Sequence, residues 1–91
     1  MLFRSVDCPD DRKEQVVRDA LAHFRAKYRV SDVDGVRILF DGGWGLIRSS
    51  NTQPILVLRF EADTDQRLAE LRAEVEGWLA TQGVTVGASA H

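Results

Sequence analysis

Three apolar segments lie close together in the middle of the chain, and the connections between them are too short to contain a helix. The segments span residues 36–40, 44–48 and 55–60. Residues 41–43 read Asp-Gly-Gly, a combination typical of a hairpin turn. Residues 49–54 are polar apart from a final proline, which favours a loop over ladder pairing. Because consecutive strands with short connections pair antiparallel, this region predicts three strands of an antiparallel sheet.

Two amphipathic segments flank these strands. Apolar side chains at helical spacing predict one helix over about residues 11–28 and another between Asp63 and Gly83. The apolar positions are Val17, Ala20, Leu21, Phe24 and Tyr28 in the first helix and Leu68, Leu71, Val75, Trp78 and Leu79 in the second.

Each predicted helix opens with the spacing of a capping box, in which side chains satisfy free backbone N–H groups. The pairs are Asp11 with Glu14 and Asp63 with Gln66. Residues 29–35 follow the first helix and are predicted to be a polar connection.

A short strand is also predicted over residues 2–6, so the order along the chain is strand, helix, three strands, helix. This order predicts an α+β two-layer sandwich, with an antiparallel sheet of about four strands and two helices on one face. Residues 1–91 form a single domain at this length. The small residues of 84–91 are expected to be a frayed tail.

Composition excludes several classes of function. The formal net charge is −2, which argues against nucleic-acid binding because that binding depends on Lys and Arg neutralising phosphates. No apolar stretch approaches the roughly 20 residues that cross a bilayer, so no membrane partner is expected. Cys8 is the single cysteine, so no internal disulfide forms, and the scattered His23 and His91 do not complete a zinc site. A reducing compartment, the cytoplasm, is expected.

The residues after the second central strand suit an anion. Arg48 offers a planar fork of donors that matches phosphate oxygens. Ser50 and Thr52 offer hydroxyl donors, and Asn51 offers an amide and tolerates left-handed backbone. No carboxylate interrupts residues 48–54. The same residues also suit an ordinary solvated loop, so their chemistry alone leaves both interpretations open.

The stretch from Trp44 to Ala62 resembles the C-terminal domain of the α-D-phosphohexomutases, in particular the bacterial phosphomannomutase/phosphoglucomutase type. That family carries Gly-Trp-Gly-Leu followed by Arg-x-Ser-Asn-Thr-x-Pro, and the second half stands here over residues 48–54 without departure. Residues 34–37, Asp-Gly-Val-Arg, match the family's entry to the hairpin. The resemblance covers about Val6 to Trp78.

The resemblance implies a role for each matching residue. Arg48, Ser50, Asn51 and Thr52 hold the phosphate of a phosphosugar at the end that is not reacting, and Pro54 fixes the exit of the loop. The variable position, Ser49, carries no implied role.

The resemblance also implies the reaction, which interconverts hexose 1-phosphate and hexose 6-phosphate through a hexose 1,6-bisphosphate. The sugars are glucose and mannose phosphates. The phosphoserine loop and the Mg²⁺ site belong to other domains of the same enzyme, so no catalytic or metal residue and no cofactor is expected in this one. The chain alone is expected to be inactive. A standalone phosphate-ligand or protein-interaction module of the same fold is the alternative.

Overall fold

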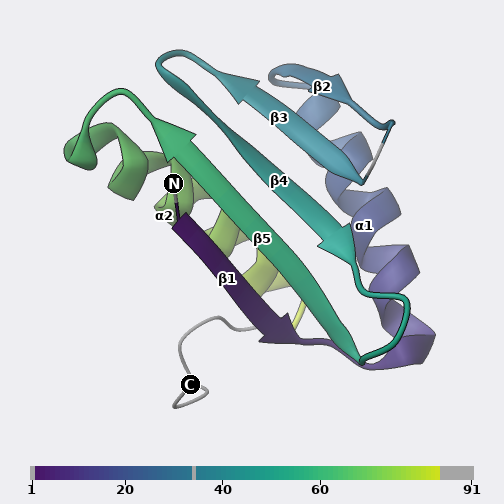
Figure 1. Cartoon of the computed structure of the whole chain (residues 1–91). Helices are drawn as coiled ribbons and strands as arrows, with labels where there is room; N and C mark the ends of the chain where they lie inside the picture. The colour runs from purple at the N-terminus through teal and green to yellow at the C-terminus, as the bar shows by residue number, and fades with distance from the viewer. Residues whose placement is uncertain (1, 34, 85–91) are drawn as a thin grey trace.

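The computed structural model describes the chain over residues 2–33 and 35–84 (Figure 1). The elements are β1 (Leu2–Asp7), α1 (Asp10–Arg25), β2 (Arg29–Ser31), β3 (Val36–Phe40), β4 (Gly43–Ser49), β5 (Ile55–Ala62) and α2 (Asp65–Thr81). The tail predicted for 84–91 lies outside these residues except for Val84, which is buried.

One antiparallel sheet holds all of these strands in the order β1-β5-β4-β3-β2. The predicted α+β two-layer sandwich is confirmed, with a fifth strand in place of part of the predicted connection 29–35. This strand, β2, pairs three residues with the edge of β3, from Arg29 opposite Leu39 to Ser31 opposite Arg37. It buries little, so no hydrophobic alternation marks it in the sequence.

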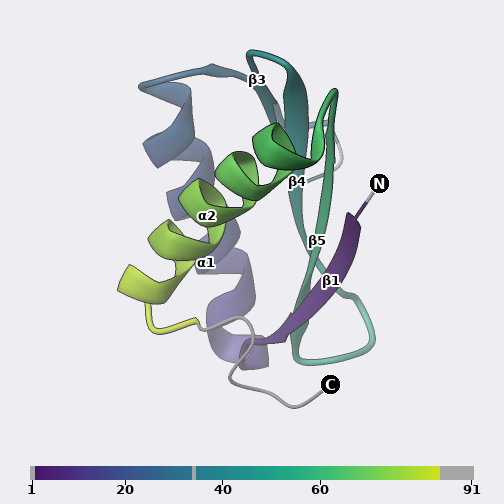
Figure 2. The ribbon, with the colours of Figure 1, turned by 90° about the vertical axis from the view of Figure 1, so that its left-hand side faces the viewer.

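Both helices pack on the same face of the sheet (Figure 2). Alternation along the strands sends every second side chain into this layer. Its centre is fully buried and contains Ile38, Ile47, Leu58 and Phe60 from the sheet, Phe24 from α1 and Val75 from α2. The opposite face is covered by no described element and carries the exposed side chains of Phe3 and Leu39.

Both predicted capping boxes are wrong. Pro9 occupies the N-cap of α1 without a side-chain cap, and its carbonyl accepts from the backbone N–H groups of Arg12 and Lys13. The fixed φ of proline starts the helix one residue earlier, which leaves Asp11 inside the first turn, where a negative charge suits the helix dipole. The predicted end at Tyr28 is also three residues too late, since α1 ends at Arg25.

The second helix is capped one residue later than predicted. The Oγ1 of Thr64 accepts from the N–H of Arg67 at 3.1 Å. Asp63 lies one residue before this cap, and its N–H donates to the carbonyl of Gly42 at 2.9 Å, which ties it to the β3–β4 turn. Neither helix in the described part of the chain is long and apolar enough to cross a membrane.

Candidate functional site

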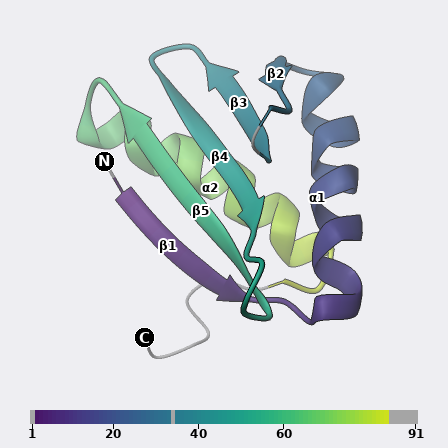
Figure 3. The ribbon, with the colours of Figure 1, turned by 45° about the vertical axis from the view of Figure 1, so that its right-hand side comes forward.

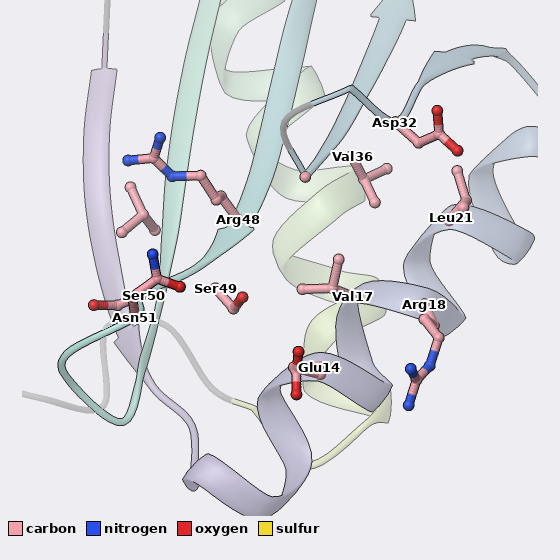
Figure 4. Close-up of a pocket in the computed structure, with 12 residues that line it drawn as sticks. Glu14, Val17, Arg18, Leu21, Asp32, Val36, Arg48, Ser49, Ser50 and Asn51 are labelled. Atoms are coloured by element: carbon pink, nitrogen blue, oxygen red, sulfur yellow. The ribbon is translucent and has the colours of Figure 1, made fainter.

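The end of β4 extends past the start of β3. The β3–β4 ladder ends at the pair Val36 and Ile47, whereas Arg48 and Ser49 pair only with β5. The free edge of β4 here faces α1 across a cavity of about 620 Å³ (Figure 4). Its walls come from α1, the start of β3, the end of β4 and the loop after it. The segment that the sequence singled out therefore lies at the mouth of a cavity.

Neighbouring residues of β4 face opposite ways at this cavity. Arg48 is exposed and lies on the open side of the sheet, with its guanidinium directed away from α1 (Figure 4). Ser49, for which the sequence implied no role, turns to the other side and faces α1. Three of the four predicted ligands, Arg48, Ser50 and Asn51, line the cavity, and the exposed Thr52 lies outside its lining.

The connection between β4 and β5, called here the 50–54 loop, is closed by its own hydrogen bonds. The N–H of Ser50 donates to the carbonyl of Ile55 at 3.1 Å, and the N–H groups of Thr52 and Gln53 both donate to the Oγ of Ser50 at 3.3 Å. A hydroxyl that accepts twice keeps its hydrogen for a third partner. Ser50 thus shapes the loop and remains a donor.

The left-handed backbone expected as an option for Asn51 is not used. Among the described residues, positive φ angles occur only at glycines. The loop contains no glycine and turns with ordinary backbone angles. Its shape must therefore be set by contacts rather than by unusual φ values.

The first turn of α1 supplies those contacts from behind the loop. The Nζ of Lys13 donates to the carbonyls of Ser50 and Gln53, the latter at 3.1 Å. The N–H of Cys8 donates to the carbonyl of Pro54 at 2.8 Å. Cys8 itself is buried, and burial raises the pKa of its thiol. Three loop carbonyls thus turn towards the β1–α1 junction.

Carboxylates line the cavity, although none interrupts the loop sequence. Glu14 on α1 faces the cavity opposite Ser49, and Asp32 stands at its upper wall (Figure 4). Sequence reasoning missed both because it could not place α1 or the connection after β2 beside the end of β4. Arg18 on α1 lines the cavity next to Glu14, so the α1 side carries charges of both signs, whereas Arg48 is the cation on the β4 side (Figure 4). An anion fits the β4 side, and a hydroxyl donor fits the carboxylate of Glu14.

A second arginine near the loop was also missed. Arg59 lies on β5 two residues beyond Val57, which is the partner of Arg48, so both guanidinium groups belong to the open face of the sheet. Diagonal neighbours on a sheet face lie about 7–8 Å apart. Alternation along the strand 55–60 would have placed Arg59 on the face of the sheet opposite to the buried side chains of Leu58 and Phe60.

The described residues contain no group of three or more His, Cys, Asp or Glu side chains that could hold a metal ion. The acidic residues at the cavity, Glu14 and Asp32, do not form such a cluster. The site chemistry available here is charge-assisted hydrogen bonding to an anion.

Residues 5–77 match the family described as "Phosphoglucomutase/phosphomannomutase, C-terminal domain". The chain is 41% identical over 70 residues to a phosphomannomutase/phosphoglucomutase of Pseudomonas putida, covering 75% of this chain and 15% of that protein. It is 41% identical over 71 residues to a probable phosphoglucosamine mutase of Methanopyrus kandleri, covering 77% of this chain and 16% of that protein.

A solved structure agrees with these sequence matches. The crystal structure of a phosphoglucomutase/phosphomannomutase family protein from Burkholderia thailandensis superposes with a TM-score of 0.57 at 36% identity, covering 78% of this chain and 15% of that one. The chain thus spans about one sixth of the length of these relatives. With its α+β sandwich and its intact Arg-x-Ser-Asn-Thr-x-Pro loop, the chain belongs to the phosphoglucomutase/phosphomannomutase family and corresponds to the C-terminal domain.

Proposed function

We propose that the chain binds the phosphate group of a phosphosugar and serves as the C-terminal domain of a phosphomannomutase/phosphoglucomutase. Arg48, Ser50, Asn51 and Thr52 hold the phosphate that is not reacting while the other end of the hexose is phosphorylated or dephosphorylated. Contacts to a non-reacting phosphate supply binding energy for positioning the sugar. The ligands are glucose or mannose phosphates and the hexose 1,6-bisphosphate.

The observation that carries this proposal is the position of the 50–54 loop. An exposed arginine, a hydroxyl with its hydrogen available and an exposed amide side chain are gathered at the mouth of one cavity. A guanidinium and neighbouring neutral donors match the oxygens of a dianion. Arg59 adds a second positive charge on the same sheet face.

The phosphosugar reaction itself needs groups that we assign to other domains of the enzyme. The described residues do not fit the Mg²⁺ site that the family resemblance implies, so we derive no step through that ion. The chain alone binds phosphate without turning over substrate, and it works in the cytoplasm, in keeping with its single cysteine.

A titration of the 91-residue chain with inorganic phosphate and with glucose 1-phosphate tests the proposal by residue-resolved NMR shifts. Amide shifts are expected to cluster at residues 48–52, with a dissociation constant in the millimolar range, about 4 kcal/mol. Arg48→Ala should abolish them. Arg29→Ala is the matched control, because Arg29 is an exposed sheet arginine on the far edge strand.

Three outcomes contradict the proposal or a part of it. Shifts that cluster away from the 50–54 loop place the ligand elsewhere. If Arg48→Ala and Arg29→Ala weaken phosphate binding equally, the loss comes from the change in net charge and not from the loss of a ligand. Mutase activity from the purified chain contradicts the assignment of the chemistry to other domains.

A further inference from the structure

We propose that Lys13 is a positioning residue for phosphate binding, which it supports by holding the backbone of the 50–54 loop so that the N–H of Asn51 points towards the ligand. The inference rests on the proposed function, since it concerns how the same site is built. Lys13 itself does not touch the phosphate in this arrangement.

Lys13 is an unusual residue of α1. It is 9% exposed and is the only charged residue classed as buried in the described part of the chain. It lies on the face of α1 that also buries Val16, Ala20 and Phe24. A lysine on an apolar helix face requires hydrogen-bond partners, because desolvating an ammonium group without them is strongly unfavourable.

The three donors of this ammonium group are all used. Two go to the carbonyls of Ser50 and Gln53, and the third goes to the Oδ1 of Asp10, one helical turn earlier, at 2.8 Å. The side chain of Asp10 is 73% exposed, so it balances the charge while remaining in solvent. The ammonium group therefore connects α1 to the loop at two points three residues apart.

These two bonds determine where the loop's backbone donors point. In a trans peptide the C=O and the following N–H point in opposite directions, and the described chain contains no cis peptide. Because the carbonyl of Ser50 turns back to Lys13, the N–H of Asn51 turns away from α1. The other carbonyl that Lys13 bonds belongs to Gln53 and is followed by Pro54. Proline has no N–H, so this second bond does not orient a backbone donor.

A backbone N–H held outwards at the mouth of the cavity is a donor fixed before the ligand arrives. Preorganised donors bind an anion more tightly than mobile ones because no ordering free energy is lost on binding. Because Asp10 balances the charge of the ammonium group, Lys13 acts on phosphate through the N–H of Asn51 rather than through its own field.

The test compares Lys13→Met with Lys27→Met in the 91-residue chain, using inorganic phosphate as the probe. Lys27 is the only other lysine, and it is exposed just beyond the far end of α1, so both variants lose one positive charge. Lys13→Met is expected to weaken phosphate binding about tenfold, and Lys27→Met less than twofold. The Asn51 amide shift induced by phosphate should disappear only in the Lys13 variant.

Lys13→Arg keeps the charge and two donors for the same carbonyls, and it should restore phosphate affinity to within about threefold of the wild type. The Asn51 response separates positioning from a purely structural role, because a residue that only stabilises the fold leaves that amide's response to phosphate unchanged.

Equal phosphate affinity in Lys13→Met and Lys27→Met overturns the inference. If Lys13→Met does not fold, Lys13→Arg decides, and a folded arginine variant without the Asn51 response overturns it as well. If the wild-type chain itself gives no shifts at residues 48–52, the proposed function fails instead, so the two failures are distinguishable.

Discussion

The two connections that join β4 to its neighbours lie at opposite ends of that strand (Figure 3). Each accepts a hydrogen bond from a cation on a different helix. At one end the Nε of Arg67 on α2 donates to the carbonyl of Asp41 at 2.6 Å. At the other end Lys13 on α1 donates to Ser50 and Gln53. The arginine side chain is 34% exposed, whereas the lysine side chain is 11% exposed.

The turn over residues 41–42 and the start of β4 depend on two glycines. Gly42 has a φ of 84°, in the left-handed region that favours glycine. A Cβ at Gly43 would lie 2.3 Å from the carbonyl oxygen of Glu61. The 50–54 loop has neither feature and depends on contacts from distant parts of the chain. A tight turn needs particular residue types, whereas a loop that presents donors to a ligand needs support from behind.

The largest effect is expected at the local turn. Gly43→Ala should lower the free energy of unfolding by about 3 kcal/mol, because the new methyl group overlaps backbone and the Cδ1 of Leu71, 2.6 Å away. Urea denaturation measures the change. Gly77→Ala is the control: nothing lies within 4 Å of its Cβ position on α2, so that variant should gain about 0.5–1 kcal/mol. If Gly43→Ala and Gly77→Ala are equally stable, the close approach of Gly43 to Glu61 and Leu71 is contradicted.

The second prediction compares the two anchoring cations directly. Lys13→Met should lower the free energy of unfolding by about 2 kcal/mol, because it removes the donor of two part-buried hydrogen bonds and leaves only the carbonyl of Gln53 with a backbone donor, the N–H of Ile55 at 2.8 Å. Arg67→Met should lower it by less than about 1 kcal/mol, since its partners Asp41 and Glu70 are exposed and solvent can replace the guanidinium. Thermal and urea unfolding of both variants check the ranking. A larger loss of stability in Arg67→Met than in Lys13→Met would contradict the ranking that burial predicts.

The contact between Tyr28 and Glu74 involves neither the 41–42 turn nor the 50–54 loop, so it serves as a reference for both. The hydroxyl of Tyr28 donates to Glu74 on α2, at 2.8 and 2.7 Å to its two oxygens, while the ring packs against Phe40. Tyr28→Phe should lower the free energy of unfolding by about 1 kcal/mol. Amide shifts at the 41–42 turn and at the 50–54 loop should stay as in the wild type.

The same contact predicts a pH dependence. The hydrogen bond to Glu74 and burial raise the pKa of Tyr28 in the folded state. Above pH of about 10 the unfolded chain loses this proton first, so the stability from this contact is present below that pH and is lost as the pH rises through the folded pKa. The free energy of unfolding of the wild type should therefore fall more steeply than that of Tyr28→Phe in alkaline solution. If the free energies of unfolding of the two proteins fall in parallel with pH, the pKa of Tyr28 is not raised in the folded state.

The smallest expected effect lies in the 50–54 loop itself. Ser50→Ala removes the acceptor of two 3.3 Å bonds from Thr52 and Gln53, and should lower the free energy of unfolding by about 0.5 kcal/mol. Hydrogen exchange at these two amides should become faster, while exchange at Gly43 stays unchanged. Unaltered exchange at Thr52 and Gln53 would mean that the hydroxyl of Ser50 does not hold the loop.

Much of the fold could be predicted from local patterns. The alternation in residues 36–40, the glycines of the 41–42 turn and the helical stripe around Val75 each report burial or backbone geometry that is fixed within a few residues. The edge strand β2 could not be predicted because it buries almost nothing. The helix starts were misplaced because the acidic residues beside the true N-caps were taken for caps, whereas Pro9 occupies the N-cap of α1 and the side chain of Thr64 caps α2.

The candidate site was predictable only on one side. The loop motif identified Arg48 and its neighbours as candidate phosphate ligands, and the polar sequence of the loop predicted that they lie at the surface. Glu14 was predicted to form a capping box with Asp11, and Lys13 was given no role, since nothing in their spacing shows which loop they face. They reach the site because α1 packs beside the free end of β4, which is a contact between segments 34 or more residues apart.

The sequence by itself determined the types of six of the seven described elements, the antiparallel middle of the sheet and the donor set around the 50–54 loop, because period, turn chemistry and side-chain type act over short distances. The tertiary structure alone decided that β1 pairs with β5, that a carboxylate faces the loop across a cavity and that a buried ammonium holds the loop from behind. Those arrangements come from packing two helices on one face of a twisted sheet, where contacts form between residues whose separation along the chain carries no information about their distance in space.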